Sequence, residues 1–261
     1  MTEERLDREP TRSDPERRFA EVLNALRSAH FDQEGIACDF AALADSSERG
    51  RLAACLAELE SLDPKTVRLA AQTAFWINLF NAGVLRDAPE LDLAASEPDL
   101  QAFFERPRLR IFGHRFSLDD IYHGLLRGNM PKHGRLRSPM ARDDARRTYM
   151  PIAYDERMHF AMYCASRSSP ALRVFESGKV DVQLEQAAAD YIRRTARVER
   201  DGAVVVAPRL LQWYAADFGG ERGVVEFVLG RLDDEAVEKV DRMRGRVKLQ
   251  YSAFDWNLNR R

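Results

Sequence analysis

The segment Met158-His-Phe-Ala-Met-Tyr-Cys-Ala-Ser-Arg-Ser-Ser-Pro170 constrains the fold more than any other part of this chain. Its first half is short, apolar and bounded by charged residues, a pattern typical of a buried strand. Its second half is small and polar and ends at a proline, which predicts a turn that leads into a helix. Such a corner places Cys164 and Ser169 where unpaired helix N–H groups favour a nucleophile or an anion-binding backbone.

Both candidate nucleophiles have a structural alternative, which we favour. Free cysteine is among the most buried residue types, so Cys164 also suits a small hydrophobic position. Ser169 directly precedes Pro170, and as a helix N-cap its hydroxyl would contribute about 1 kcal/mol. As a nucleophile Ser169 would need a dedicated base, and no Gly-x-Ser-x-Gly motif accompanies it.

His159 and Cys164 cannot form a local catalytic pair. On a strand, residues five apart face opposite sides and lie about 16 Å apart. On a helix they would be about 140° apart around the axis. A base for Cys164 must therefore come from elsewhere in the chain, with His123 and His114 as the candidates, and His159 is structural or serves another group.

Five sequence blocks resemble the domain of unknown function 547 family. They occur in the family's order and together span roughly residues 19–259. The blocks are Ala74-Phe-Trp-Ile-Asn-Leu-Phe-Asn-Ala82, the segment around Cys164, and residues 117–127, 210–219 and 251–259. The resemblance implies a fold more firmly than an activity, and it implies no substrate.

The chain departs from that family at three polar positions. The family usually has His, Glu and a second Cys where this chain has Arg86, Tyr122 and Ser169. Those are residue types that a catalytic or metal site uses. The resemblance therefore leaves two hypotheses. One is a thiol- or serine-dependent hydrolase or transferase for a small acyl or peptide-like substrate, in which a distant His and Asp255 serve Cys164 or Ser169 as base and orienter. The other is a non-catalytic binding or scaffold protein that keeps the family cleft.

Asn78 and Asn81 are the most conspicuous polar residues of the apolar block that contains them. Three residues apart on a helix, they share a face. Asparagine is a poor helix former and costs free energy when buried without partners. The two amides either tie down the backbone of a neighbouring loop or line a cleft. In a cleft they would orient a substrate or a catalytic His, and Arg86 and Tyr122 are further candidates for substrate binding.

Composition and charge do not favour a nucleic-acid partner. The chain has 40 basic and 42 acidic residues in 261, so no global charge favours nucleic acid. Residues 106–147 carry eleven basic and four acidic residues, but aromatic residues are not interleaved with them. We interpret residues 128–147 as a solvated mobile loop, with an anionic partner as the alternative. A small molecule or peptide remains the expected ligand, and the oligomeric state is left open.

The cysteines and histidines predict no metal and no cofactor. The three cysteines form no Cys-x-x-Cys pair, the five histidines are scattered, and no phosphate-binding glycine loop is present. Unpaired cysteines suit a reducing compartment, so we expect a cytoplasmic location. The first residues lack the apolar core of a signal peptide, and no window approaches the ~18 apolar residues of a membrane helix.

The periodicity of apolar residues along the chain predicts more helices than strands. Residues 1–13 predict a disordered N-terminal tail, and residues 14–261 a single domain. Helices are expected at about 14–30, 46–62, 63–86, 117–128 and 181–196, with two more from 208 and 222. Strands are expected at 35–40, 109–112, 114–116, 203–207 and 247–251, besides the apolar half of the Cys164 segment. This predicts an α+β fold, a mostly helical single domain around a small mixed or antiparallel sheet of about 4–6 short strands.

Aromatic residues mark the expected core. Trp76, Phe80, Trp213 and Trp256 lie in apolar stretches where packing is the default. The C-terminal block around Trp256 is rich in aromatic and amide groups, so it should fold back onto the domain. We expect Asp255 or Asn257 to hydrogen-bond near the helix face of the two asparagines, with a simple apolar latch as the alternative.

Overall fold

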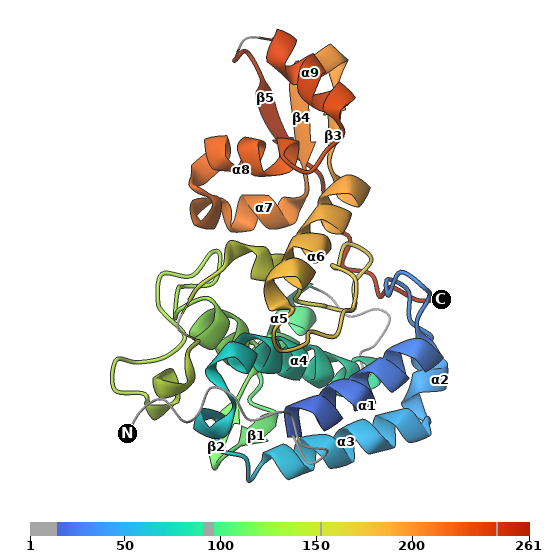
Figure 1. Ribbon diagram of the computed structural model, residues 1–261, viewed down its shortest axis with the longest axis vertical. Helices are drawn as coiled ribbons and strands as arrows, with labels where there is room; N and C mark the ends of the chain where they lie inside the picture. The colour runs from blue at the N-terminus through green and yellow to red at the C-terminus, as the bar shows by residue number, and fades with distance from the viewer. Residues whose placement is uncertain (1–14, 91–96, 152, 244) are drawn as a thin grey trace.

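Helices form most of the chain, and two small sheets complete it (Figure 1). This computed structural model describes residues 15–90, 97–151, 153–243 and 245–261. The helices are α1 (Pro15–His30), α2 (Phe40–Ala44), α3 (Ser47–Leu59), α4 (Leu69–Asp87), α5 (Glu97–Glu105), α6 (Val180–Thr195), α7 (Arg209–Trp213), α8 (Gly220–Leu229) and α9 (Asp234–Arg242). The expected mostly helical α+β fold is confirmed, while the predicted tail at residues 1–13 lies outside the described residues.

Short helical turns carry much of the polar chemistry. Most are 3₁₀ turns, and η3 is a π-helix, a form that often occurs at functional sites. They are η1 (Pro64–Thr66), η2 (Ala88–Glu90), η3 (Asp120–Leu126), η4 (Ala145–Tyr149), η5 (Glu156–Phe160), η6 (Arg200–Gly202) and η7 (Ala215–Phe218). Ser117 and Asp120 begin η3 with the expected capping box, because each backbone N–H donates to the other side chain at 2.9 Å.

The described strands form two sheets. Strands β1 (Leu109–Ile111) and β2 (His114–Phe116) form the expected antiparallel hairpin. In the other sheet, β4 (Val204–Ala207) lies between β3 (Arg197–Glu199), which is antiparallel to it, and β5 (Lys248–Tyr251), which is parallel. The larger sheet is therefore mixed, which is one of the two sheet types that the sequence predicts.

The two ends of the molecule are built from different secondary-structure elements. In Figure 1 the mixed sheet stands with α8 and α9 at one end, while α1, α3 and α4 pack together at the other. Helix α4 lies at the centre of that packing, and its Trp76 and Phe80 are buried as expected. Trp213 and Trp256 are only half-buried, and they stack on each other with ring centroids 5.6 Å apart.

Several elements differ from the sequence prediction. The strand expected at residues 35–40 is wrong, because only isolated bridges form at Cys38 and Phe40 already begins α2. The helix expected over 63–86 is two elements, since extended backbone at Val67 and Arg68 separates η1 from α4. Helices α5 and α9 and strand β3 were not predicted. Asp233 caps α9 by accepting a hydrogen bond from the Ala236 N–H.

Candidate functional site

The side-chain amides of the two asparagines in α4 hydrogen-bond to backbone groups. The Asn78 amide donates to the Phe175 carbonyl at 2.8 Å and accepts from the Phe175 N–H at 2.9 Å. The Asn81 amide donates to the Ala161 carbonyl and accepts from the Tyr163 N–H, both at 3.0 Å. Both side chains are buried, so the geometry matches the first of the two expectations, an amide that ties down a neighbouring loop.

Those amides hold a segment that is not a strand. The strand expected in the first half of the Cys164 segment is wrong, because residues 156–160 form the 3₁₀ turn η5 and an irregular backbone follows. Asp155 initiates the turn by accepting from the Arg157 N–H at 2.9 Å. The apolar residues are buried without a ladder because Asn81 supplies the hydrogen bonds that a neighbouring strand would give.

Cys164 and Ser169 are adjacent, but each contacts hydroxyl or backbone groups. Ser169 Oγ accepts from the Cys164 N–H at 2.9 Å and donates to the Pro170 carbonyl at 2.8 Å. No helix begins at Pro170, so the N-cap expectation for Ser169 is wrong. The Cys164 thiol lies 3.3 Å from Ser166 Oγ, and burial raises its pKa. Among the described residues, no histidine hydrogen-bonds to either nucleophile candidate.

His159 instead forms the centre of a buried polar network. Its Nδ1 lies 2.7 Å from the Tyr122 hydroxyl, and its Nε2 lies 2.8 Å from Asp217 Oδ2. Arg127 clamps the same carboxylate through Nε at 2.5 Å and Nη2 at 2.7 Å, and the Tyr154 hydroxyl donates to it at 2.8 Å. The network joins η3, η5 and η7, which are far apart in the chain.

The network is desolvated and electrostatically balanced. The side chains of His159 and Asp217 are 0% and 2% exposed. Although burial opposes it, hydrogen bonds from Arg127, His159 and Tyr154 hold the pKa of Asp217 well below its usual value. Burial lowers the pKa of His159 despite the nearby carboxylate. A neutral imidazole that donates from Nε2 to Asp217 and accepts at Nδ1 from Tyr122 satisfies every partner.

A second buried histidine, which also contacts Tyr122, lines a pocket. The His123 ring stacks on the Tyr122 ring with centroids 4.2 Å apart. Its Nδ1 has no hydrogen-bond partner among the described residues, and its Nε2 lies 3.9 Å from Asp119 Oδ1. Burial, with the charges of Lys132 and Arg127, lowers the pKa of His123 well below its usual value. The imidazole is therefore neutral at pH 7.

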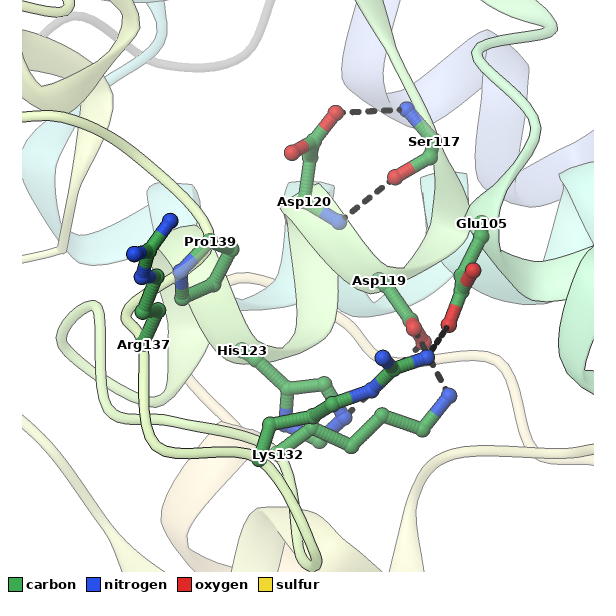
Figure 2. A pocket seen from close by; sticks show the side chains of 9 residues that line it. Glu105, Ser117, Asp119, Asp120, His123, Lys132, Arg137 and Pro139 are labelled. Atoms are coloured by element: carbon green, nitrogen blue, oxygen red, sulfur yellow. Dashed lines mark hydrogen bonds and ion pairs between the residues drawn. The ribbon is translucent and has the colours of Figure 1, made fainter.

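We call the cavity beside this ring the His123 pocket (Figure 2). It has a volume of about 220 Å³, and polar or charged side chains dominate its wall. The lining residues are Glu105, Ser117, Asp119, Asp120, His123, Lys132, Arg135, Arg137 and Pro139. They come from the end of α5, the start of η3 and the basic segment 128–147, which the sequence analysis had interpreted as a mobile loop.

Hydrogen bonds and ion pairs attach that basic segment to the domain. Within the segment, Asn129 exchanges two 3.0 Å hydrogen bonds with the Met140 backbone. Lys132 contacts Asp119 at 2.7 Å, which connects the segment to η3. The segment thus forms a wall of the pocket, while Arg135, Arg137 and Arg142 remain exposed.

The remaining predicted site residues lie elsewhere. Arg86 forms a bidentate pair with the neighbouring Asp87, at 2.7 and 2.9 Å. His114 packs against the rings of Phe116 and Tyr149. Tyr122, a predicted substrate-binding residue, contacts two predicted catalytic ones, His159 through its hydroxyl and His123 through its ring.

The C-terminal block folds back as expected, but to a different place. The Asp255 carboxylate accepts from the Asn257 backbone N–H at 2.9 Å and lies 3.7 Å from Arg167. Its own N–H donates to Ser168 Oγ at 2.8 Å. The expected hydrogen bond near the asparagine face of α4 is therefore wrong, since those amides already bind residues 161, 163 and 175.

The sequence analysis missed Arg127, Tyr154 and Asp217. Asp217 lies within a block that the resemblance had marked, but nothing in its spacing indicated a partner 58 residues away. Within the described residues, no group of three or more His, Cys, Asp or Glu side chains could hold a metal ion. None of the described helices is long and apolar enough to cross a membrane.

Comparison with known families agrees with the resemblance in the sequence. Residues 64–192 match the model of a family described as "Protein of unknown function, DUF547". The chain contains a DUF547 family domain. The matched range includes both asparagines, both buried histidines and the His123 pocket, whereas Asp217 and Asp255 lie outside it. The comparisons returned no matching curated protein and no matching solved structure.

Proposed function

We propose that this chain is a non-catalytic binding protein that holds a small molecule or short peptide in the His123 pocket. One observation carries the proposal: the nucleophile candidates are bonded into their own backbone, whereas the His123 pocket contains a buried imidazole without a hydrogen-bond partner. Buried polar groups in folded proteins are nearly always hydrogen-bonded, so an exception beside a cavity favours a ligand site.

The competing proposal is a thiol- or serine-dependent hydrolase or transferase for a small acyl or peptide-like substrate. A thiol nucleophile needs a lowered pKa or an adjacent base, and burial raises the pKa of Cys164 instead. Ser169 Oγ already donates its proton to the Pro170 carbonyl. His159, the nearest histidine in sequence, is bonded at both ring nitrogens to Tyr122 and Asp217. These contacts favour binding over catalysis.

A cytoplasmic location is part of the proposal. Cys38, Cys55 and Cys164 are all free thiols in the structure. Burial raises the pKa of Cys38 to about 12, which keeps that thiol protonated and inert. Free thiols are usual in the reducing cytoplasm.

Alkylation and acyl-transfer assays test the choice between binding and catalysis. We expect iodoacetamide to modify Cys164 more slowly than glutathione at neutral pH, and p-nitrophenyl acetate to give no burst of p-nitrophenol. Cys164→Ala and Ser169→Ala should leave the slow background hydrolysis unchanged. Rapid alkylation of Cys164 at pH 6 that spares Cys38 and Cys55, or a burst that either variant abolishes, would establish nucleophilic catalysis and refute the proposed function.

A further inference from the structure

The charges around the His123 pocket leave one cation without a partner. Asp119 pairs with Lys132 at 2.7 Å, and Glu105 pairs with Arg135 at 2.8 Å. The third acid of the wall, Asp120, pairs at 2.8 Å with Arg146, which does not line the pocket.

Arg137 is that remaining cation. It is exposed, and it forms no ion pair and no side-chain hydrogen bond within the part of the chain that the structure describes. In Figure 2 its guanidinium lies on the side of the pocket opposite Glu105. A planar guanidinium binds carboxylates and phosphates through two parallel hydrogen bonds, so this group is suited to an oxyanion.

His123 adds an independent observation inside the same pocket. Its side chain is 2% exposed, Nδ1 has no hydrogen-bond partner among the described residues, and Nε2 lies 3.9 Å from Asp119 Oδ1, beyond hydrogen-bond distance. The neutral ring carries one N–H, and leaving a buried polar group unpaired destabilises the folded chain. With the proton on Nε2, the ring has an N–H to donate to a ligand in the pocket that it lines, and an oxyanion supplies the acceptor.

We infer that the His123 pocket binds the carboxylate or phosphate group of a small anion, with Arg137 as its counter-ion and His123 as a hydrogen-bond donor. This inference rests on the proposed function and specifies the ligand class. The cavity of about 220 Å³ has space for about seven water molecules, so it fits a compact ligand. The acids of the wall are each neutralised by an ion pair, which limits their repulsion of an incoming anion.

An NMR titration of the histidine ring nitrogens tests this inference. The probes are acetate and inorganic phosphate, with acetamide as the neutral analogue and methylammonium as the cation, all at constant ionic strength. The His123 signals are assigned by their loss in His123→Gln. We expect one or both oxyanions to shift these signals, and the neutral and cationic probes to leave them unchanged. Acetate and phosphate distinguish a carboxylate from a phosphate ligand.

Two arginine variants make the titration specific. Arg137→Gln should weaken oxyanion binding at least about tenfold, because it removes a charge-assisted bidentate contact. Arg142→Gln is the matched control, since Arg142 is exposed in the same basic segment but does not line the pocket. The Arg142→Gln variant should bind the oxyanion with the same affinity as the unmodified chain.

Several results would overturn the inference. One is that acetamide or methylammonium shifts the His123 signals as much as the oxyanions do. Another is that the two arginine variants weaken oxyanion binding equally. A third is that neither oxyanion shifts the signals at tens of millimolar. Shifts with acetamide would refute the oxyanion while leaving the proposed binding function in place. An acyl-enzyme at Cys164 or Ser169 would refute the proposed function by a separate measurement, whatever the titration shows.

Discussion

Two buried histidines contact Tyr122 and differ in their hydrogen bonds. The Tyr122 hydroxyl binds Nδ1 of His159, and the Tyr122 ring stacks on His123. Both imidazoles are about 1% exposed, yet both nitrogens of His159 are hydrogen-bonded, and neither nitrogen of His123 is hydrogen-bonded to a residue that the structure describes. A fully satisfied polar network stabilises one arrangement of the chain, whereas an unsatisfied group costs stability and indicates a place for a ligand.

The largest expected effect is a loss of stability when the His159 network loses one of its charged partners. Asp217→Asn keeps the shape but leaves the Arg127 guanidinium, 7% exposed, without its counter-charge. Removing one partner of a buried ion pair costs about 3–5 kcal/mol. We expect a fall in melting temperature of about 10 °C for a chain of this size. Asp255→Asn is the control, because its half-exposed carboxylate should contribute little. Equal melting temperatures for the two variants would show that the network is not stabilising.

A smaller effect concerns the pH dependence of stability. The folded chain keeps His123 neutral, so below its usual pKa of 6.5 the unfolded state binds the extra proton. The free energy of unfolding therefore falls as the pH falls below 6.5. His123→Gln should reduce that slope by up to one proton, about 1.4 kcal/mol per pH unit. Urea unfolding between pH 5 and 8 measures it, and an unchanged slope would show that His123 is protonated in the folded chain.

The smallest effect concerns the unpaired arginine of the pocket. Arg137→Gln should change the free energy of unfolding by less than about 0.5 kcal/mol, because an exposed side chain without partners contributes little. Denaturant unfolding at neutral pH, with no added oxyanion, measures the change. A loss above 1 kcal/mol would assign Arg137 to the structure rather than to a ligand, which would remove the contrast between the His159 network and the His123 pocket.

Local chemistry made much of the fold predictable. The hairpin of β1 and β2, the capping box of Ser117 and Asp120, helix α6 and the strands β4 and β5 all follow from residue patterns within a few positions. The apolar run that ends at Cys164 was predicted wrongly because its backbone is satisfied by Asn81, about 80 residues earlier in the chain. Side-chain to backbone bonds of that range leave no period in the sequence.

The candidate site was less predictable for the same reason. His123 and His159 were named from the sequence, but their difference lies in partners supplied by other segments. Asp217 lies 58 residues from His159 and 90 from Arg127, so no spacing rule connects them. The absence of a partner at His123 is a property of the packed structure alone.

The contact between the two ends of the described chain bears on the order of folding. The Asn259 side chain donates to the Ile36 carbonyl, 223 residues earlier, and the Cys38 N–H donates to the Asn259 carbonyl. During synthesis at about 5–20 residues per second, the turn at Ile36 waits about 11–45 seconds for Asn259. Helices α1 and α3 complete their own hydrogen bonds within that interval, so the backbone between α1 and α2 is among the last parts of the chain to reach its final pairing.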